Sequence, residues 1–550
     1  MIYENFLANL YIGSSQNGVL KSFDVFHPDE KALEIINAYR SVSREFPSTD
    51  LEEQGMVPSE LMDKLRQINF FGLNIPAAYG GVGLRLLQYL KVVEEVVKTD
   101  MSLGITALAH LSIGTKGIVL FGNEAQKKKY LVPAAAGEMI FSYALTEPRT
   151  GSDAQNIETT ATLSDDGGYY ILTGQKTYIT NANYAGGLTV FAQMDPDKPG
   201  FMGAFIVETA WNGVKIGKEI PKMGLKASST ATVQFKDVRV PKENLLGEPG
   251  DGFKIAMTIL NYGRVALAAA SNGMMQQSLD DMAKRSSVRT QFGVPINQFE
   301  LIQEKLVKAR VNGWVGSAIT EVTAGLLEDN PLALAAIESS HSKLFGTTRA
   351  WDTLYDAMQV AGGSGYFSTQ PYAKRMRDFR VTTIFEGTTE IHSIYPALFL
   401  ARNLSKRALD YSKHRPLQLL FLLKGMIKRP RLKIVIKKSG TRSALRLARA
   451  NARRINFMIH AGLLRYGEKI FEKEFFLRKI TNLSLYFYGL LAGLIKIENS
   501  EKSGNTIDED LKLLAYFAEE ARENRDRNRM LFSSRKERLH EEIMAEILSA

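Results

Sequence analysis

The spacing of apolar and polar residues divides the chain into four regions. From about residue 30 to 140, apolar positions recur every three or four residues, as in KALEIINAYRSVSREF, which is typical of amphipathic helices. From about 141 to 250 the period changes to two, and TATLSDDGGYYILTGQKTYIT predicts two strands joined by a tight turn. Helical spacing returns beyond about 251. We therefore predict an α+β chain with domains at 1–140, 141–250, 251–405 and 406–550.

Length and composition narrow the classes of function. With 550 residues the chain is long enough for about three or four domains, and 45% hydrophobic residues are ordinary for a globular protein. The absence of cysteine excludes disulfides, thiolate metal sites, iron–sulfur clusters and cysteine nucleophiles. Only seven histidines are present, without an HExxH-like pair, so we expect no metal site.

The apolar stretches also predict where the protein resides. The N-terminal residues MIYENFLANLYIGSS lack a basic region followed by an apolar core, so we expect no secretory signal. No run reaches the roughly 20 apolar residues that a transmembrane helix needs. The longest, Leu483–Ile495, has 13 residues and predicts a buried helix. We therefore expect a cytoplasmic protein, soluble or peripheral on the inner face of the cytoplasmic membrane.

Two short motifs lie in the predicted β region. YALTEPRTGSDA (Tyr143–Ala154) contains Thr-Glu-Pro and Gly-Ser-Asp, which are turn formers that an ordinary loop would also use. Such small residues equally let backbone amides and hydroxyls approach a flavin ring and a phosphate. About 30 residues on, Tyr178 in TYITN stands near a strand end, where it could stack on a flavin or on a neighbouring strand.

These motifs belong to a longer series that resembles the acyl-CoA dehydrogenase family in order and spacing, over about residues 30 to 400. The blocks are SYALTEPRTGSDA, GQKTYITN, MGLKASSTATVQFKDVRVPKENLLGEPGDGFKIAM, RTQFGVPI, QVAGGSGY and IFEGTTEIH. Among the branches of this family, AHLSIGTKGIVLFG, ILNYGR and LIQEKL most resemble the very-long-chain enzymes, which also have a long helical C-terminal extension. The resemblance implies an N-terminal helical domain, a central antiparallel β domain, a C-terminal four-helix bundle and an extra helical domain.

The resemblance assigns the chemistry to Glu386, in RVTTIFEGTTEIH (Arg380–His392). It implies that Glu386 is the general base that removes a proton beside an acyl-CoA thioester while a hydride passes to FAD, leaving a trans-2-enoyl-CoA. A carboxylate flanked by an aromatic residue and shielded from water has a raised pKa, which suits a base. Without the resemblance, Glu386 could equally be an ordinary acid beside a helix N-terminus, with no catalytic role.

The resemblance also implies a set of FAD contacts. Arg289 matches an arginine that reaches the flavin pyrophosphate of a neighbouring subunit, so the enzyme is expected to be at least a dimer; otherwise it is a surface cation. Gln359 and its glycine joint match contacts on the adenine side. The expected FAD-binding residues are Tyr143, Leu145, Thr146, Gly151, Ser152, Tyr178, Ile179, Thr180, Arg289, Phe292, Gln359, Gly362, Gly363, Thr388 and Glu390. Most relatives have tryptophan at the position of Tyr178.

Substrate contacts are expected on both sides of the base. The resemblance points to Ser152 near the CoA pantetheine, to Asn261 and Arg264, and to Gly387, which lets the chain turn tightly beside the ligand. Some family members take the base from the position of Gly263 instead. Glycine there removes that option and leaves room for an acyl chain, although it could equally ease helix packing.

The C-terminal extension is strongly basic. Residues 401–460 contain 17 Lys and Arg against one acid, so they carry +16, and since the whole chain carries +10 the remainder carries −6. Arg442, Arg446, Arg449 and Arg453 flank an apolar stripe, a pattern of helices that lie on anionic membranes. Residues 406–460, including the cations of Lys428–Gly440, could instead pack on their own domain or bind nucleic acid, which no groove-reading motif supports.

Together these features predict a FAD-dependent long-chain acyl-CoA dehydrogenase of fatty-acid β-oxidation that passes electrons to electron-transfer flavoprotein. An acyl-CoA oxidase, which uses oxygen, is the alternative within enzymes. A flavin-retaining scaffold or assembly factor for a membrane complex is the alternative outside them, and the retained Glu386 argues against it.

Overall fold

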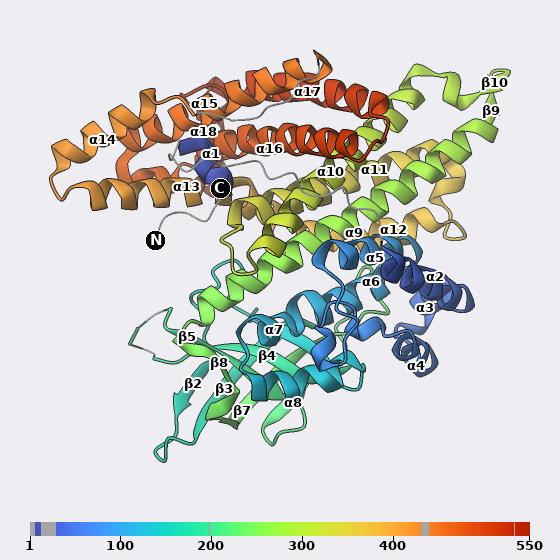
Figure 1. The fold of residues 1–550 in the computed structure, drawn as a ribbon, viewed down its shortest axis with the longest axis vertical. Coiled ribbons are helices and arrows are strands. Elements are labelled where there is room, and N and C mark those ends of the chain that lie inside the picture. The colour runs from blue at the N-terminus through green and yellow to red at the C-terminus, as the bar shows by residue number, and fades with distance from the viewer. Residues whose placement is uncertain are drawn as a thin grey trace.

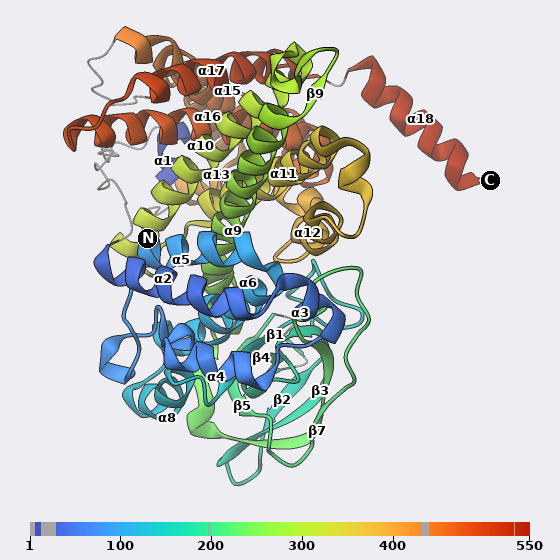
Figure 2. The same cartoon turned by 90° about the vertical axis from the view of Figure 1, so that its right-hand side faces the viewer.

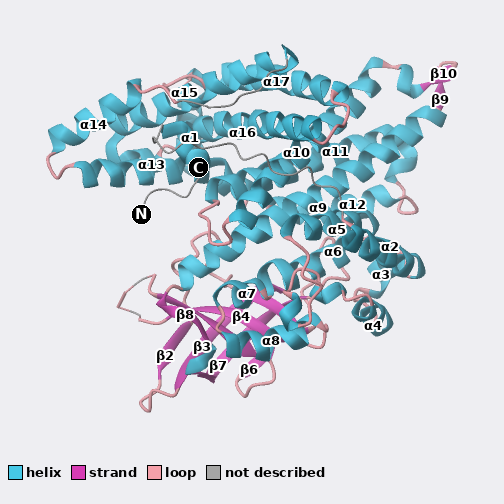
Figure 3. Ribbon diagram, in the orientation of Figure 1, coloured by secondary structure: helices cyan, strands magenta, loops and turns pink. Residues whose placement is uncertain are grey.

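The computed structural model describes residues 6–12, 29–195, 197–198, 200–430, 439–532 and 534–549. Figure 1 shows a β-sheet at one end of the molecule, the longest helices in the middle and a layer of C-terminal helices at the other end. The predicted order of helices, sheet, helices and helical tail is confirmed, and Figure 3 shows that strands are concentrated at the sheet end.

The N-terminal helices pack between the sheet and the long helix α9 (Gly252–Val288). Their amphipathic patterns place Ile36 and Tyr39 in the core, and the side chain of Asp29 caps the first turn of the second helix by accepting from the Ala32 amide. These elements are α2 (Glu30–Glu45), α3 (Ser48–Gln54), α4 (Ser59–Gln67), α5 (Leu86–Thr99), α6 (Met101–Leu108), η3 (Ala109–Gly114), α7 (Lys116–Phe121) and α8 (Glu124–Ala135). Helix α1 (Phe6–Ile12) lies outside the predicted 1–140 domain, because it packs on α11 and α15 in the core of the C-terminal helices.

The central domain is a mixed sheet with the order β6-β7-β3-β2-β4-β5-β8, and β1 also pairs with β4. The expectation of an antiparallel sheet is correct for most pairs, but β1 and β2 both run parallel to β4. Parallel pairing is possible because long connections separate these strands from β4. The strands are β1 (Ile140–Ala144), β2 (Thr160–Leu163), β3 (Tyr169–Thr180), β4 (Ala185–Gln193), β5 (Met202–Glu208), β6 (Val214–Ile216), β7 (Thr230–Pro241) and β8 (Leu245–Gly250).

Long helices form the bundle that follows the sheet. Helix α9 packs against α10 and α11, and α11 in turn contacts α13. The glycine-rich joint between α11 and α12 contains a short 3₁₀ helix, η6. The elements are α9, β9 (Thr290–Gln291), β10 (Val294–Pro295), α10 (Glu300–Asp329), α11 (Ala336–Ala361), η6 (Gly362–Tyr366), α12 (Pro371–Phe379), η7 (Arg380–Thr383) and α13 (Thr389–Tyr411).

The C-terminal extension shares one hydrophobic core with α10, α11 and α13. Helix α18 is the exception: it leaves the body of the molecule (Figure 2), and none of its described side chains is buried. The elements are α14 (Arg415–Ile427), η8 (Ser439–Thr441), α15 (Arg442–Tyr466), η9 (Gly467–Glu472), α16 (Glu474–Lys502), α17 (Asp508–Asn528) and α18 (Arg535–Ser549).

Two predictions about the extension can be compared with this packing. The apolar stripe of α15, which includes Leu445, Ala452 and Ile459, is buried within the protein. The expectation that this stripe lies on a membrane is therefore wrong, because neighbouring helices already cover it. Much of Lys428–Gly440 lies outside the described residues.

Within the described ranges, two helical segments are long and apolar enough to cross a membrane by average hydropathy, Met101–Phe121 and Glu474–Lys502. Counting uninterrupted apolar runs missed both, because an average tolerates the polar residues between them. In each case 83% of the apolar window is buried inside the protein, as expected of core helices. The apolar run Leu483–Ile495 lies in the second segment, which confirms the predicted buried helix.

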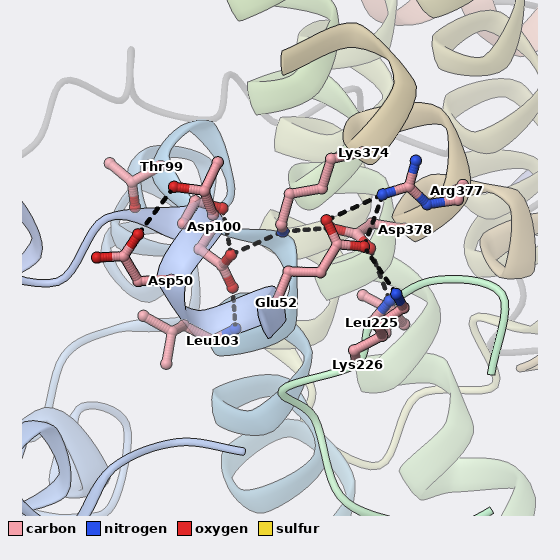
Figure 4. Close-up of polar contacts among 12 residues, drawn as sticks. Asp50, Glu52, Thr99, Asp100, Leu103, Leu225, Lys226, Lys374, Arg377 and Asp378 are labelled. Atoms are coloured by element: carbon pink, nitrogen blue, oxygen red, sulfur yellow. Dashed lines mark hydrogen bonds and ion pairs between the residues drawn. The ribbon is translucent and has the colours of Figure 1, made fainter. Parts of the chain in front are cut away.

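A buried charge cluster joins the three domains ahead of the segment that carries Glu386 (Figure 4). Lys374 of α12 donates to Asp100, at 2.9 Å, and to Asp378, at 2.6 Å. Asp378 also accepts from the backbone amide of Leu225 in the β domain at 2.6 Å. Both aspartates are at most 4% exposed. The cluster fixes the end of α12, eight residues before Glu386, relative to both other domains.

Candidate active site

A loop of the β domain forms the first wall of the site. Lys176 and Glu147 make a buried ion pair at 2.7 Å, and the Lys176 ammonium group also donates to the Leu145 carbonyl at 3.1 Å. Thr177 donates its amide to the Thr146 carbonyl at 2.9 Å. Since a buried charge pair tolerates little movement, Leu145 and Thr146 are held rigidly beside the end of β3.

The end of β3 places Tyr178 at the same wall. Tyr178 has a φ of 56°, which is uncommon for a residue with a side chain. The residue is 66% exposed. A bulge interrupts the pairing of β3 with β7 between Lys176 and Ile179. The bulge accounts for the turned-out ring, because it removes Tyr178 from the regular alternation of the strand.

Glu386 stands on the opposite wall, in the turn between η7 and α13. Its φ is 57° and that of Gly387 is 97°, so two successive residues are left-handed. Thr388 then begins the helix, where its hydroxyl accepts from the Ile391 amide at 3.3 Å. This reversal directs the Glu386 side chain back toward α9.

The Glu386 carboxyl lies against the backbone of Gly263 in α9. A side-chain carbon added to Gly263 would lie 3.0 Å from each carboxyl oxygen and 2.8 Å from Ile113. The base itself thus occupies part of the room that glycine provides, and Gly263 also lines the cavity described below. Oε2 of Glu386 is buried and has no hydrogen-bond partner in the part of the chain that the structure describes.

This environment changes the protonation of Glu386. Loss of water around the carboxyl raises its pKa from 4.5 to about 7, while the charges of Arg264 and Lys343 act in the opposite direction. A carboxylate with a pKa near neutrality is a stronger base than an ordinary glutamate. The arrangement can therefore remove a weakly acidic proton from a ligand bound beside it.

A cavity of about 650 Å³ lies between these walls. Most of its remaining lining is apolar and comes from α9, α13 and the α6–η3 region, for example Leu260, Leu398 and Leu108. A largely apolar cavity that is also lined by a desolvated carboxyl suits a ligand with a hydrocarbon tail and a reactive polar group.

The structure brings together most of the site residues that the sequence predicted. The lining of the cavity includes Tyr143, Leu145, Thr146, Gly151, Ser152, Tyr178, Ile179, Thr180, Arg264, Glu386 and Gly387. Asn261 does not line it: its side-chain oxygen accepts from the Ser339 hydroxyl at 2.8 Å. Thr388 serves as the helix cap, and Glu390 is exposed in the next turn.

The other predicted residues lie far from the cavity within this chain. Arg289 is 25 residues beyond Arg264, next to the far end of α9, which corresponds to roughly 37 Å of helix. Phe292 is 94% exposed in the adjacent hairpin, and Gln359, Gly362 and Gly363 are exposed at the end of α11. These residues can contact a ligand at the cavity only if it belongs to another subunit.

Sequence reasoning missed two buried polar residues beside the base, Lys343 and His392. Lys343 belongs to none of the quoted motifs, but it stands within SSHSKLFG, and a lone lysine in a buried helix is an unusual core residue. His392 is the last residue of RVTTIFEGTTEIH, and the motif alone assigns no role to it. The deep apolar lining from α13 was also missed, because its spacing resembles that of any core helix.

The residues around the cavity fit the FAD that the resemblance implies. Thr146, Ser152 and Thr180 offer hydroxyl and backbone groups on the β-domain wall. Tyr178 offers an exposed ring face on the same wall, and no described atom lies within 4 Å of a side-chain carbon built on Gly151. Opposite them, the unpartnered oxygen of Glu386 is available to a second ligand between base and ring.

Comparisons with known proteins agree with this geometry. Family models of the acyl-CoA dehydrogenase N-terminal, middle and C-terminal domains match residues 33–138, 142–238 and 250–416. The human very long-chain specific acyl-CoA dehydrogenase is 36% identical over 478 residues, which cover 84% of this chain and 73% of the relative. The chain belongs to the acyl-CoA dehydrogenase family, a family of FAD-dependent oxidoreductases.

Solved structures extend the similarity beyond these domains. An acyl-CoA dehydrogenase from Bacillus anthracis, complexed with FAD, has a TM-score of 0.79 at 28% identity and covers 94% of this chain and 92% of its own. Butyryl-CoA dehydrogenase from Megasphaera elsdenii has a TM-score of 0.64 at 34% identity, covering 68% of this chain and 99% of its own. The C-terminal extension is therefore a feature shared with some relatives only.

Replacing Gly263 with alanine tests the contact between α9 and the base. We expect Gly263→Ala to lower the free energy of unfolding by about 1–3 kcal/mol, because the added methyl group overlaps Glu386 and Ile113. Chemical denaturation of Gly263→Ala, Glu386→Ala and the double variant measures the coupling between the two positions. The double variant should lose less stability than the sum of the single variants.

Gly313→Ala is the matched control, since Gly313 lies within helix α10 with open space around it. It should be neutral or gain up to about 1 kcal/mol, as alanine favours helix interiors. A coupling between Gly263 and Glu386 below about 0.5 kcal/mol would show that the carboxyl does not lie against this glycine.

Proposed function

We propose that this protein is a FAD-dependent dehydrogenase that converts long-chain acyl-CoA thioesters to trans-2-enoyl-CoA. The observation that supports this most directly is the desolvated Glu386 carboxyl, which lines a largely apolar cavity and whose Oε2 has no hydrogen-bond partner among the described residues. Family membership supplies the reaction class, and the desolvated carboxyl supports Glu386 as its base.

Different groups of this chain have different roles in the proposed reaction. Oxygen atoms of the ionised Glu386 carboxyl take the proton from the carbon next to the thioester carbonyl, and the apolar walls exclude water that would weaken the base. The Glu386 amide is the expected donor to the thioester oxygen, where negative charge develops. When bound, FAD accepts the hydride that leaves the adjacent carbon.

The lining of the cavity supports a long acyl chain. Beyond the carboxyl, α9 contributes Phe253, Met257 and Leu260, and α13 contributes Ile394 and Leu398. These side chains are apolar and flexible, so a hydrocarbon tail can displace water along the whole length of the space. A short substrate would leave most of this lining unused.

Electron-transfer flavoprotein is the proposed acceptor, in the setting of fatty-acid β-oxidation. The resemblance to acyl-CoA dehydrogenases, rather than any feature of the cavity alone, supports this over an oxidase that uses oxygen. A purely structural role for a retained flavin is disfavoured, because a scaffold has no use for a desolvated carboxylate that costs stability.

The active unit is proposed to be at least a dimer. Arg289 and Phe292 lie on an exposed hairpin, remote from the cavity of their own chain, and Gln359 is exposed near the exposed Tyr366 and Phe367. A second copy that brings these residues to a neighbouring FAD would explain both the remote position and the exposed aromatic side chains.

Replacing Glu386 with glutamine tests the proposed function. Glu386→Gln keeps the size of the side chain but removes the base, so the protein should still bind FAD while losing flavin reduction by at least about 10³-fold. The measurement is the bleaching of the flavin absorbance after anaerobic addition of palmitoyl-CoA. Bleaching by the variant at the wild-type rate would refute the role of Glu386, and no bleaching of wild type by any acyl-CoA would refute the proposed function.

We also propose that the extension binds the inner face of the cytoplasmic membrane, through α14 rather than α15. This helix exposes an apolar face and is flanked by exposed cations, a combination that suits anionic lipid surfaces. The exposed apolar residues are Leu417, Leu419, Leu420, Leu423 and Ile427. A membrane-bound enzyme would receive long acyl chains where they accumulate.

Co-sedimentation with vesicles tests this surface. Replacing Leu420 and Leu423 with serine should lower binding to anionic vesicles by about tenfold or more, because two inserted leucine side chains are lost. The matched control replaces Leu163 and Leu332, which are exposed to a similar extent elsewhere. Equal binding by both double variants would contradict a role for α14.

A further inference from the structure

The backbone that carries the base is in a conformation that needs support. Glu386 and Gly387 have φ values of 57° and 97°, and glutamate rarely adopts the first of these. Such a residue costs of order 1–3 kcal/mol and persists only where its surroundings determine it. The direction of the Glu386 carboxyl therefore depends on whatever holds these two peptide groups.

Three side chains hold the carbonyl groups of this turn. The Glu386 carbonyl oxygen lies 3.0 Å from Nε2 of His392 and accepts from Nε of Arg264 at 3.4 Å. The Gly387 carbonyl accepts from Nζ of Lys343 at 2.6 Å. Lys343 and His392 are fully buried and neither lines the cavity, whereas Arg264 does.

The bonding of His392 determines its tautomer. A carbonyl oxygen can only accept, so Nε2 of His392 must carry the hydrogen. Nδ1 is then the acceptor for the hydroxyl of Ser340, which lies 2.7 Å away. The ring also fits closely against the turn, because a side-chain carbon on Gly387 would lie 2.6 Å from Nε2. His392 is thus a neutral donor fixed from behind by α11.

We propose that Lys343 and His392 are positioning residues for the base, and we call the pair the carbonyl clamp. Lys343 of α11 holds the Gly387 carbonyl, and His392 of α13 holds the Glu386 carbonyl. The clamp thereby keeps the Glu386 carboxyl facing the cavity. Neither residue would touch substrate or cofactor. The proposal rests on the proposed function, since it assigns a task within the same reaction.

The two members of the clamp differ in their electrostatic effect. The charge of Lys343 lowers the pKa of Glu386, and this effect is present while Lys343 is protonated, since burial lowers the pKa of Lys343 itself to about 7. Burial also keeps the pKa of His392 well below its ordinary value, so that His392 stays neutral. Other groups that act on this region are Arg264 of α9, Tyr143 of β1, His341 of α11 and Glu390 of α13. Loss of Lys343 should therefore change both the position and the pKa of the Glu386 carboxyl. Loss of His392 should change the position of this carboxyl alone.

Variants that keep or remove the donor separate these effects. His392→Leu removes the donor, and His392→Gln places an amide donor near the position of Nε2. Lys343→Met removes donor and charge, and Lys343→Gln removes the charge alone. Lys116→Met is the matched control, because Lys116 is buried over the ring of Tyr262 and is not among the groups that shift the pKa of Glu386.

The test follows anaerobic flavin reduction by palmitoyl-CoA as a function of pH. His392→Leu should reduce the limiting rate by about 10- to 100-fold with the acidic limb unmoved, and His392→Gln should recover most of the loss. Both Lys343 variants should move the acidic limb to higher pH by about one unit, since a cation that favours the ionised carboxylate is gone. Lys116→Met should leave the limb in place.

A second readout does not depend on turnover. Hydrogen exchange of the backbone amides in residues 384–391 should be faster in His392→Leu than in wild type or in His392→Gln. Should His392→Leu fail to fold, Ser340→Ala takes its place, since it removes the partner of Nδ1 and should show smaller changes of the same sign.

The clamp is overturned by a wild-type reduction rate in His392→Leu, by equal losses in His392→Leu and His392→Gln, or by an unmoved acidic limb in Lys343→Met. If wild-type protein is not reduced by any acyl-CoA, the proposed function fails instead. Hydrogen exchange then still decides whether the clamp holds the turn.

Discussion

The Glu386 carboxyl group lies against the backbone of Gly263, and one of its oxygens has no hydrogen-bond partner among the described residues. Burying an unpaired polar atom costs stability, so this contact exists only because the rest of the fold enforces it. Its consequence is a carboxylate whose pKa is raised to about 7. The proposed reaction depends on that one desolvated acid.

Several features of the fold converge on this position. The charge cluster around Lys374 fixes α12 to the N-terminal and β domains, and the base follows eight residues after Asp378. The ion pair of Lys176 and Glu147 holds the facing loop. The extension packs on α13 from the other side, which stabilises the helix that begins at Thr388. The site is therefore formed by contacts between domains, and buried charges stabilise the junctions between them.

The domain order and the strands could be predicted because helical and alternating spacings are local patterns. The residues on the flavin side came instead from the resemblance to the family, because the pattern around Tyr178 alone left stacking on a flavin and stacking on a neighbouring strand both open. The position of Asn261 was not predictable, since its partner Ser339 is 78 residues away. Lys343 was missed for the same reason, since the Gly387 carbonyl that it contacts is 44 residues away. His392 lies only six residues from Glu386, but the sequence does not show that its ring turns back to the Glu386 carbonyl. The apolar stripe of α15 was misread because amphipathicity does not reveal what covers a helix.

The ionisation of Glu386 is the quantity that tests this account most directly. Infrared difference spectra of the protein as a function of pH, with Glu386→Gln subtracted, isolate the carboxyl stretch of this residue. We predict a protonated carboxyl that ionises with a midpoint near pH 7. A midpoint near the ordinary value of 4.5 would show that the carboxyl is solvated and would contradict the account.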